Sequence, residues 1–569
     1  MKFLTSLASK LTFVSNLNNV QSCKFKPDLD TFYHYTSGYW LCNDKEHRAA
    51  RSVTFNVPAF CRAAAEAVGA KAVIDMVKIN ESLNRVFLVR FDTGREAIAR
   101  FPTPLAGPPH FTTASEVATM DFLRRQLAFP IPRVLAWSSR AETTDVGAEF
   151  ILMEKAPGCL LSGVWKGVPI KEKVNFAEML GKYESQLLDL KFTHYGSLYY
   201  KDDVPPALRA PTLLEDAAPA DELNSIFCIG PMARRDYWEA ERETMDIDRG
   251  PWRTPEEYMT AVASREQAWI SRFGTPHILD DPNRVLPDQG DRADHVSCLS
   301  LYTTYVPFLV PAEPEHTRPI MWHPDLHASN IFIAGSESGK EATIAEPLVL
   351  SAIIDWQGTC IGPAFLQLKV PPLFRTPDAP VGLQMPSLPD NFETLEESQK
   401  EELREKQRGL ICHKVYEAMA FPLSIVNMKA RKELIHVEDL AQVTWKYGLI
   451  PFRMAIYRVW QHWEDVMPGT PVPDLYSAEV IDKLEATNAI WLEHNELMDD
   501  LAHEFGLGEF GLVKGDWNHF EKVRAALEKK KLEHVAQGKD EEAKMLRSLL
   551  WPYRDTLSDP DVIPRLTTG

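Results

Sequence analysis

Apolar and polar residues alternate over three short stretches in the first quarter of the chain. These stretches run from Ala72 to Ile79, from Arg85 to Phe91 and from Arg95 to Phe101. A period of two is typical of half-buried strands. Asp92-Thr93-Gly94 separates the last two stretches, and an Asp-x-Gly turn favours a hairpin. The pattern therefore predicts a small antiparallel sheet.

A helix is predicted to begin near Thr113, directly after these strands. Four positions at helical spacing share one of its faces, namely Glu116, Met120, Leu123 and Leu127. Glu116 therefore lies on an apolar face, and a desolvated carboxylate is costly without a partner. Arg100, near the end of the third predicted strand, is the predicted partner of Glu116.

Two more strands and several helices complete the pattern. The strands are predicted from Arg133 to Trp137 and from Glu149 to Glu154. Helical periodicity appears in four later segments, namely Lys171 to Leu190, Leu395 to Leu410, Phe520 to Gln537 and Glu541 to Leu550. The Leu395 to Leu410 segment is dense in Glu, Lys and Arg and is predicted to be solvent-exposed. A sheet of antiparallel hairpins with one helix, followed by helices, indicates an α+β fold.

Composition narrows the class of protein. The chain has 569 residues, of which 45% are hydrophobic, and a formal net charge of -18. This length allows a large core and more than one lobe. The acidic balance argues against a nucleic-acid partner, because phosphate backbones attract Lys and Arg. The eight cysteines form no Cys-x-x-Cys pair, so neither a disulfide framework nor a zinc site is indicated. No apolar stretch reaches the ~20 residues of a transmembrane helix.

The strongest chemical signal is the segment from Trp322 to Ile333, which contains Asp325 and Asn330, followed by Ile353-Ile354-Asp355-Trp356. Phosphoryl transfer needs a carboxylate that orients the attacking hydroxyl and accepts its proton. It also needs an amide oxygen and a second carboxylate that hold magnesium against the ATP phosphates. Asp325, Asn330 and Asp355 supply these three groups.

A rival interpretation uses His323, Asp325 and His327. On an extended strand these side chains project to one side, where they would ligate a transition metal. This interpretation leaves Asn330 and Asp355 without a role, so phosphoryl transfer is favoured.

The motif His-x-Asp-Leu-His-x-x-Asn, paired with Ile-Ile-Asp-Trp, resembles the signatures of the aminoglycoside phosphotransferase and choline-kinase-like superfamily. The resemblance implies a bilobal protein-kinase-like fold, with a small antiparallel-sheet N-lobe and a larger, mostly helical C-lobe. It implies ATP and Mg²⁺ as cofactors, Asp325 as the catalytic residue, and Asn330 and Asp355 as metal ligands. The implied acceptor is a hydroxyl of a small molecule. The long gap from Asn330 to Asp355 predicts an enlarged hairpin over Gly335 to Glu346.

The resemblance also implies nucleotide contacts in the N-lobe. In kinase folds a strand cation contacts the phosphates and is braced by a helix Glu, so these roles fall to Arg100 and Glu116. Met153 and Glu154 belong to the segment expected to meet the adenine. The turn from Asn80 to Asn84 lacks the glycines common in relatives, so phosphate contact there is expected from Ser82 or Asn84. Arg100 replaces the usual Lys, which keeps the charge but changes its geometry.

Four further stretches resemble the fungal altered-inheritance-of-mitochondria branch of this superfamily, namely Tyr35 to Leu41, Gly196 to Tyr200, Arg249 to Trp252 and Asp355 to Gly358. This resemblance implies a mitochondrial location. The first residues support it, because four lysines lie among apolar and Ser residues before the first acid, Asp28. The expected organisation is a targeting segment at 1–30, a nucleotide-binding lobe at 31–155, a catalytic and substrate lobe at 156–510, and a helical extension at 511–569.

Two other function classes are alternatives to a small-molecule phosphotransferase. A catalytically weak or inactive kinase-like scaffold in mitochondria is motivated by the glycine-free turn and by Arg100. Protein-kinase activity is disfavoured, because no Asp-Phe-Gly or Ala-Pro-Glu segment follows the catalytic motif. The sequence identifies neither the acceptor nor the oligomeric state.

Overall fold

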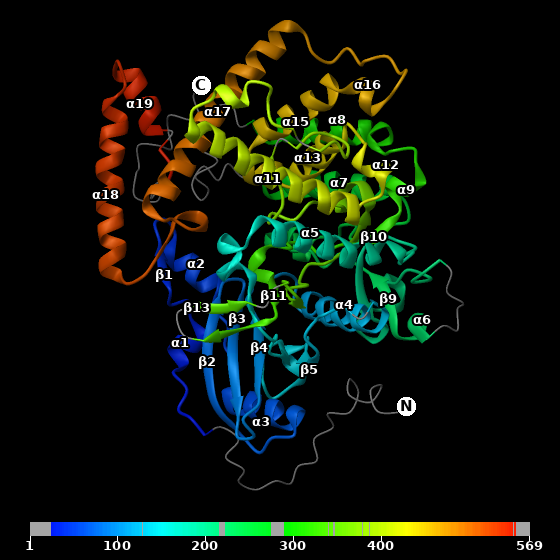
Figure 1. The fold of residues 1–569 in the computed structure, drawn as a ribbon, viewed down its shortest axis with the longest axis vertical. Coiled ribbons are helices and arrows are strands. Elements are labelled where there is room, and N and C mark those ends of the chain that lie inside the picture. The colour runs from blue at the N-terminus through cyan, green and yellow to red at the C-terminus, as the bar shows by residue number, and fades with distance from the viewer. Residues whose placement is uncertain are drawn as a thin grey trace.

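The computed structural model of the chain describes residues 24–127, 129–215, 222–274, 290–338, 341–344, 347–377, 379–385, 387–549 and 551–553. A small sheet-containing lobe lies against a larger, mostly helical lobe (Figure 1). The predicted α+β class and bilobal arrangement are therefore confirmed. Residues 1–23, which make up most of the predicted targeting segment, lie outside the described residues.

The small lobe is built on a five-stranded antiparallel sheet. Its strands in chain order are β2 (Val73–Glu81), β3 (Asn84–Phe91), β4 (Glu96–Pro102), β5 (Val134–Ser138) and β6 (Phe150–Glu154). Their lateral order is β2-β3-β4-β6-β5. All five predicted strands are thus present, with ends within two residues of the prediction. The predicted β3–β4 turn is closed by Gly94, whose φ of 78° suits a residue without Cβ.

Two helices cover this sheet lobe. Helix α3 (Val57–Val68) packs on β2 and β5, and α4 (Phe111–Leu127) packs on β5 and β6. The predicted face of α4 is buried at Glu116, Met120 and Leu123. An aromatic core fills the lobe, in which the rings of Phe55 and Phe101 stack with centroids 3.9 Å apart.

Three small sheets carry the chain through the segment that holds the predicted catalytic motif. They involve β7 (Cys159–Leu160), β10 (Pro319–Met321), β11 (Ile331–Ile333), β12 (Gly335–Ser338), β13 (Glu341–Ile344), β14 (Leu350–Ile353) and β15 (Ile361–Pro363). Strand β11 lies between β14 and β7, and β10 pairs with β15. Strands β12 and β13 form the enlarged hairpin predicted from the sequence.

Helix α5 (Ile170–Ser185) is the predicted helix after the sheet lobe, and it packs along α11 (Glu397–Ala420). The Tyr416 hydroxyl of α11 donates to Glu184 Oε2 of α5 at 2.5 Å. The charged first half of α11 is largely exposed, as predicted, whereas its second half is buried from Cys412 onward.

Sequence periodicity did not resolve the elements between α5 and β10. They are β8 (Ser197–Tyr200), α6 (Glu222–Ile226), β9 (Phe227–Gly230), α7 (Pro255–Phe273), α8 (Arg292–Leu309) and α9 (Pro314–Thr317). Strands β8 and β9 pair with each other, and β8 packs on α4. Helix α7 begins with a capping box between Thr254 and Glu257, a signal that was present in the sequence.

The rest of the large lobe is helical, and most of its helices pack around one hydrophobic core. Those not yet named are α10 (Ala364–Gln367), α12 (Leu423–Val426), α13 (Arg431–Ala441), α14 (Thr444–Tyr447), α15 (Leu449–Gln461), α16 (Trp463–Val466) and α17 (Ala478–Phe505). Within the described part of the chain, no helix combines the length and apolarity that crossing a membrane requires.

The two ends of the described chain meet on one flank of the molecule. The first elements are α1 (Leu29–Tyr33), β1 (Gly38–Trp40) and α2 (Asp44–Ala50), and the last are β16 (Leu512–Lys514), α18 (Trp517–Ala536) and α19 (Glu541–Leu549). Strand β1 pairs antiparallel with β16, with Tyr39 opposite Val513. Figure 1 shows α18 along this flank beside β1, and α19 packed against α18. The two helices predicted near the C-terminus are therefore present.

Candidate functional site

The loop after β10 is fixed by His323. Its Nδ1 accepts a hydrogen bond from the Asp325 backbone N–H at 3.2 Å, and its Nε2 lies 3.1 Å from the Ile354 carbonyl oxygen. These partners require a neutral ring with the proton on Nε2. Burial lowers the pKa of His323 to about 4, which favours this neutral form. His323 therefore connects the loop after β10 to the residue that follows β14.

This geometry argues against the rival transition-metal site. Both ring nitrogens of His323 are already used, so neither is free to ligate a metal. Across the described ranges, no group of three or more His, Cys, Asp or Glu residues is placed to hold a metal ion. His327 is half-exposed, and its Nδ1 accepts from the Ser329 N–H at 3.1 Å.

Asn330 connects the loop to the same strand end. Its backbone oxygen accepts from the Ile354 N–H at 2.9 Å, and its Nδ2 donates to the Asp325 backbone oxygen at 2.9 Å. The side chain is buried. Because the amide uses Nδ2 in this bond, Oδ1, the atom by which an amide binds metal, remains available.

Asp355 follows β14 in the left-handed region, with a φ of 65°. Such a conformation costs a non-glycine residue about 1–3 kcal/mol and persists only where its surroundings impose it. The next residue, Trp356, is buried, and its ring lies 4.6 Å from that of His323. Trp356 therefore anchors the turn that places the half-exposed Asp355 carboxylate.

Arg100 on β4 reaches this carboxylate and also the helix carboxylate predicted as its partner. Its Nη1 lies 2.5 Å from Glu116 Oε1 and 3.1 Å from Asp355 Oδ1. The predicted Arg100–Glu116 ion pair is thus present. Burial raises the pKa of Glu116 to about 7, although Arg100 pulls it down. Burial by itself would lower the pKa of Arg100. The carboxylates of Glu116 and Asp355 have the larger effect, so the pKa of Arg100 is raised.

Gln357 is a site residue to which the sequence assigned no role, although it belongs to the family-resembling stretch from Asp355 to Gly358. Its Oε1 accepts from Arg100 Nη2 and, at 2.8 Å, from Asn84 Nδ2. Its Nε2 donates to the Ala106 backbone oxygen at 2.6 Å. Gln357 thus joins the large lobe to β3, β4 and the segment before α4. Its position two residues after Asp355 was the available signal.

The other residues predicted to contact nucleotide differ from one another in exposure and in hydrogen-bond partners. Ser82 is exposed in the β2–β3 turn, where its N–H donates to Asn80 Oδ1 at 3.2 Å. Met153 is buried at the end of β6. The Glu154 carboxylate pairs with Arg133 Nε at 3.1 Å, so this side chain is held beside the start of β5. The structure brings Asn84, but not Ser82 or Glu154, into contact with Arg100 or its partners.

Asp325 differs from the other acidic residues of the site in its exposure. Its side chain is 67% exposed, and Oδ2 lies 3.5 Å from His327 Nε2. The carboxylate is therefore accessible to a molecule approaching the loop. Backbone hydrogen bonds place the Asp325–Asn330 loop beside Ile354 and Asp355. The site thus combines an exposed carboxylate, a half-exposed carboxylate, an amide oxygen and a buried cation.

Several known proteins are similar to this chain. Residues 77–366 match the model of a family described as "Phosphotransferase enzyme family". A subtelomeric hrmA-associated cluster protein of Aspergillus fumigatus is 30% identical over 84% of this chain and 97% of its own length. The mitochondrial altered inheritance of mitochondria protein 9 of Yarrowia lipolytica is 29% identical over 62% of this chain and 64% of its own length. A structure of the gentamicin–APH(2")-IIa complex aligns with a TM-score of 0.31 and 12% identity, over 74% of this chain and 98% of that one.

Proposed function

Because the chain belongs to the phosphotransferase enzyme family, we propose that it transfers the γ-phosphoryl group of ATP to a hydroxyl of a small molecule. The contacts that support this proposal are those that place the Asp325–Asn330 loop beside Asp355 and Arg100. They gather on one strand end the groups that phosphoryl transfer needs. The acceptor is not identified.

Asp325 is the proposed catalytic base. Its exposed carboxylate is accessible to an acceptor hydroxyl, and its backbone is held on both sides by His323 and Asn330. A base held in this way orients the hydroxyl and accepts its proton without first having to reorganise.

Asn330 and Asp355 fit the requirements of a magnesium site. Both offer oxygen, the ligand type that Mg²⁺ prefers, and few protein ligands suffice because Mg²⁺ keeps waters and binds phosphates. Bound magnesium supplies positive charge that neutralises the phosphates. Asn330 Oδ1 and the Asp355 carboxylate are the atoms proposed to hold it.

Arg100, braced by Glu116, is the proposed phosphate cation. The end of β6 at Met153 and Glu154 is proposed to meet the adenine, and the β2–β3 turn with Ser82 and Asn84 to lie near the phosphates. These assignments make 31–155 the nucleotide lobe and 156–510 the catalytic and substrate lobe, with 511–569 as an extension.

A thermal-shift series tests the nucleotide site. ATP with Mg²⁺ should raise the melting temperature of the wild type in proportion to occupancy, and more than ATP alone. Asp355→Ala should abolish this shift. Asp439→Ala is a matched control, because Asp439 is also 48% exposed and also ion-paired, to Lys369. Equal magnesium-dependent shifts in all three proteins would rule out Asp355 as a ligand.

A second candidate function is a kinase-like binding protein with little or no catalysis. It is favoured by the absence of glycine from the β2–β3 turn and by the two carboxylates and the amide that already surround Arg100. Asp325→Asn separates the candidates in a complementation test. The enzyme requires this carboxylate, whereas a scaffold functions without it.

We also propose a mitochondrial location, with residues 1–30 as the targeting segment. The Yarrowia lipolytica relative carries a mitochondrial name, whereas the name of the Aspergillus fumigatus relative does not mention mitochondria. Fluorescence microscopy of the full chain and of a chain lacking residues 1–30 tests the proposal. Mitochondrial signal should be present in the first and lost in the second.

A further inference from the structure

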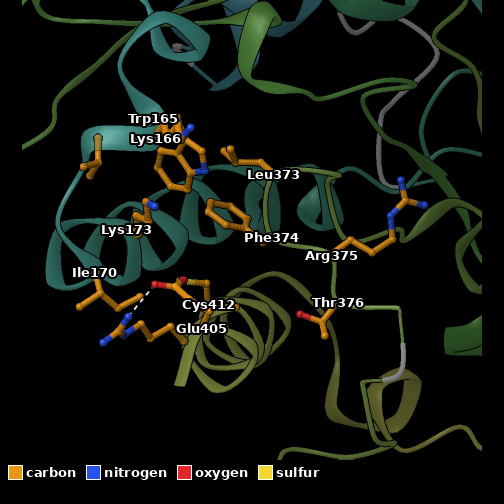
Figure 2. A pocket seen from close by; sticks show the side chains of 13 residues that line it. Trp165, Lys166, Ile170, Lys173, Leu373, Phe374, Arg375, Thr376, Glu405 and Cys412 are labelled. Carbon is orange, nitrogen blue, oxygen red and sulfur yellow. Dashed lines mark hydrogen bonds and ion pairs between the residues drawn. The ribbon is translucent and has the colours of Figure 1, made fainter. Parts of the chain in front are cut away.

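A pocket of about 340 Å³ lies in the large lobe between α5 and α11. Its walls are the 3-10 turn at Trp165–Gly167, the first turn of α5, the segment from Leu373 to Thr376, and the middle of α11. Figure 2 shows Trp165, Lys173 and Phe374 gathered on one side of it. This volume is in the range of small-molecule sites.

The lining of this pocket is strongly cationic. Four cations and one carboxylate are among the lining residues, namely Lys166, Lys173, Arg375, Arg408 and Glu405. Glu405 is engaged by Arg408 at 2.6 Å. The described part of the chain supplies no ion-pair partner for Lys166, Lys173 or Arg375. A local positive field in a chain of net charge -18 favours anions at this place.

Aromatic rings form the second part of the lining. The rings of Trp165 and Phe374 meet edge to face, with centroids 5.8 Å apart. The ammonium of Lys173 lies 5.2 Å from the Trp165 ring centroid. A planar ring entering the pocket would therefore contact both an aromatic surface and a cation, an arrangement that binds aromatic anions.

The first turn of α5 adds to this preference. Pro169 precedes the helix and its side chain makes no capping hydrogen bond. Backbone N–H groups at a helix N-terminus favour negative charge. Ile170 and Lys173 from this turn line the pocket. The N-terminal end of α5 therefore favours an anion in the pocket, as the lysines do.

This pocket is distinct from the phosphotransferase site. None of its lining residues is Asp325, Asn330, Asp355, Arg100 or Glu116. The two places are nevertheless connected, because the turn at Leu161–Gly163 packs on the catalytic-loop turn at Ala328–Asn330 and continues directly into the Trp165 wall.

We propose that this pocket binds a small aromatic anion carrying a phosphate or carboxylate group. Lys166 and Lys173 contact the anionic group, and Trp165 and Phe374 contact the ring. The proposal does not depend on phosphotransferase activity, since it uses none of the residues of that site.

Isothermal titration of the full chain with phenyl phosphate tests the proposal. One molecule should bind per chain, at least about tenfold more tightly than inorganic phosphate or benzyl alcohol, because each of these lacks one part of the ligand. Lys173→Gln and Lys166→Gln should each weaken binding about tenfold. Lys182→Gln, on the exposed part of α5, should leave it unchanged.

Three results would overturn the proposal. They are no saturable binding of phenyl phosphate, equal affinity in Lys173→Gln and wild type, and equal weakening by Lys182→Gln. Titration of Asp355→Ala distinguishes the two sites. Retained phenyl phosphate binding in this variant supports a separate pocket, whereas its loss would place the anion at the nucleotide site. Replacing phenyl phosphate with phenylacetate then shows whether phosphate or carboxylate is preferred.

Discussion

Arg100 Nη1 lies 3.1 Å from Asp355 Oδ1, so the cation proposed for the phosphates and the carboxylate proposed for magnesium are in direct contact. One residue comes from a strand of the small lobe and the other from the end of β14. Any change at Arg100 therefore affects both lobes and both proposed roles.

Arg100→Ala should destabilise the fold at neutral pH. It leaves the buried Glu116 without its cation, and removal of one partner from a buried pair costs about 3–5 kcal/mol. Urea unfolding measures the loss. The double variant Arg100→Met with Glu116→Leu should recover part of it, since no buried charge remains, while still failing to bind ATP. A single variant as stable as the wild type would contradict the structural role of the pair.

Glu184 should make stability depend on pH. Burial raises its pKa to about 8 from an ordinary value of 4.5, so the folded state binds the proton more tightly than the unfolded state. Stability therefore falls as pH rises from about 5 to 8. Glu184→Gln cannot ionise, and it should gain about 2–4 kcal/mol relative to the wild type across this window.

Melting temperatures of both proteins at pH 5 and pH 8 measure this difference. Glu178→Gln is the control, because Glu178 lies on the same helix but has a 45% exposed side chain. Its melting temperature should change with pH as that of the wild type does. If the melting temperatures of Glu184→Gln and the wild type changed equally between pH 5 and pH 8, ionisation of Glu184 would not destabilise the folded state.

His323→Ala should loosen the catalytic loop. It removes the acceptor of the Asp325 N–H and the partner of the Ile354 oxygen, and unpaired buried groups cost about 1–3 kcal/mol each. Denaturant unfolding should show a loss of this size. His462→Ala replaces a half-exposed histidine and should change stability by less than about 0.5 kcal/mol. If His323→Ala lost no more free energy of unfolding than His462→Ala, His323 would not be needed to position the loop.

Gly38→Ala should detach the C-terminal extension from β1. A Cβ at Gly38 would collide with the Val513 backbone oxygen of β16. Limited proteolysis should then cut residues 511–549 faster than in the wild type. Gly163→Ala is the matched control, because an added Cβ there meets no atom within 4 Å. Equal cleavage in both variants would show that this strand pair contributes little to docking.

The sheet lobe was predictable because its signals are local. Alternation, the Asp92-Thr93-Gly94 turn and the spacing of Glu116 on α4 each depend on a few neighbouring residues. The pairing of Arg100 with Glu116 followed from the cost of burying a charge alone. The motif that contains Asp325 and Asn330 was recognisable for a related reason, since its residues lie close together in the sequence.

Features set by distant contacts were not predictable. Gln357 matters because it meets Asn84, Arg100 and Ala106, more than two hundred residues away in the sequence. The pairing of β1 with β16 depends on the small size of Gly38, which has no periodicity to mark it. The capping box of α7 was a local signal, but the prediction relied on apolar periodicity, which did not resolve this helix.

The β1–β16 pair also has a consequence for synthesis. Ribosomes add about 5–20 residues per second, so Tyr39 waits roughly half a minute or more before Val513 exists to pair with it. During that time β1 presents an unpaired strand edge, which other chains can join. The newborn protein is therefore expected to rely on chaperones until translation ends, and premature termination before β16 should yield aggregates rather than a shorter folded protein.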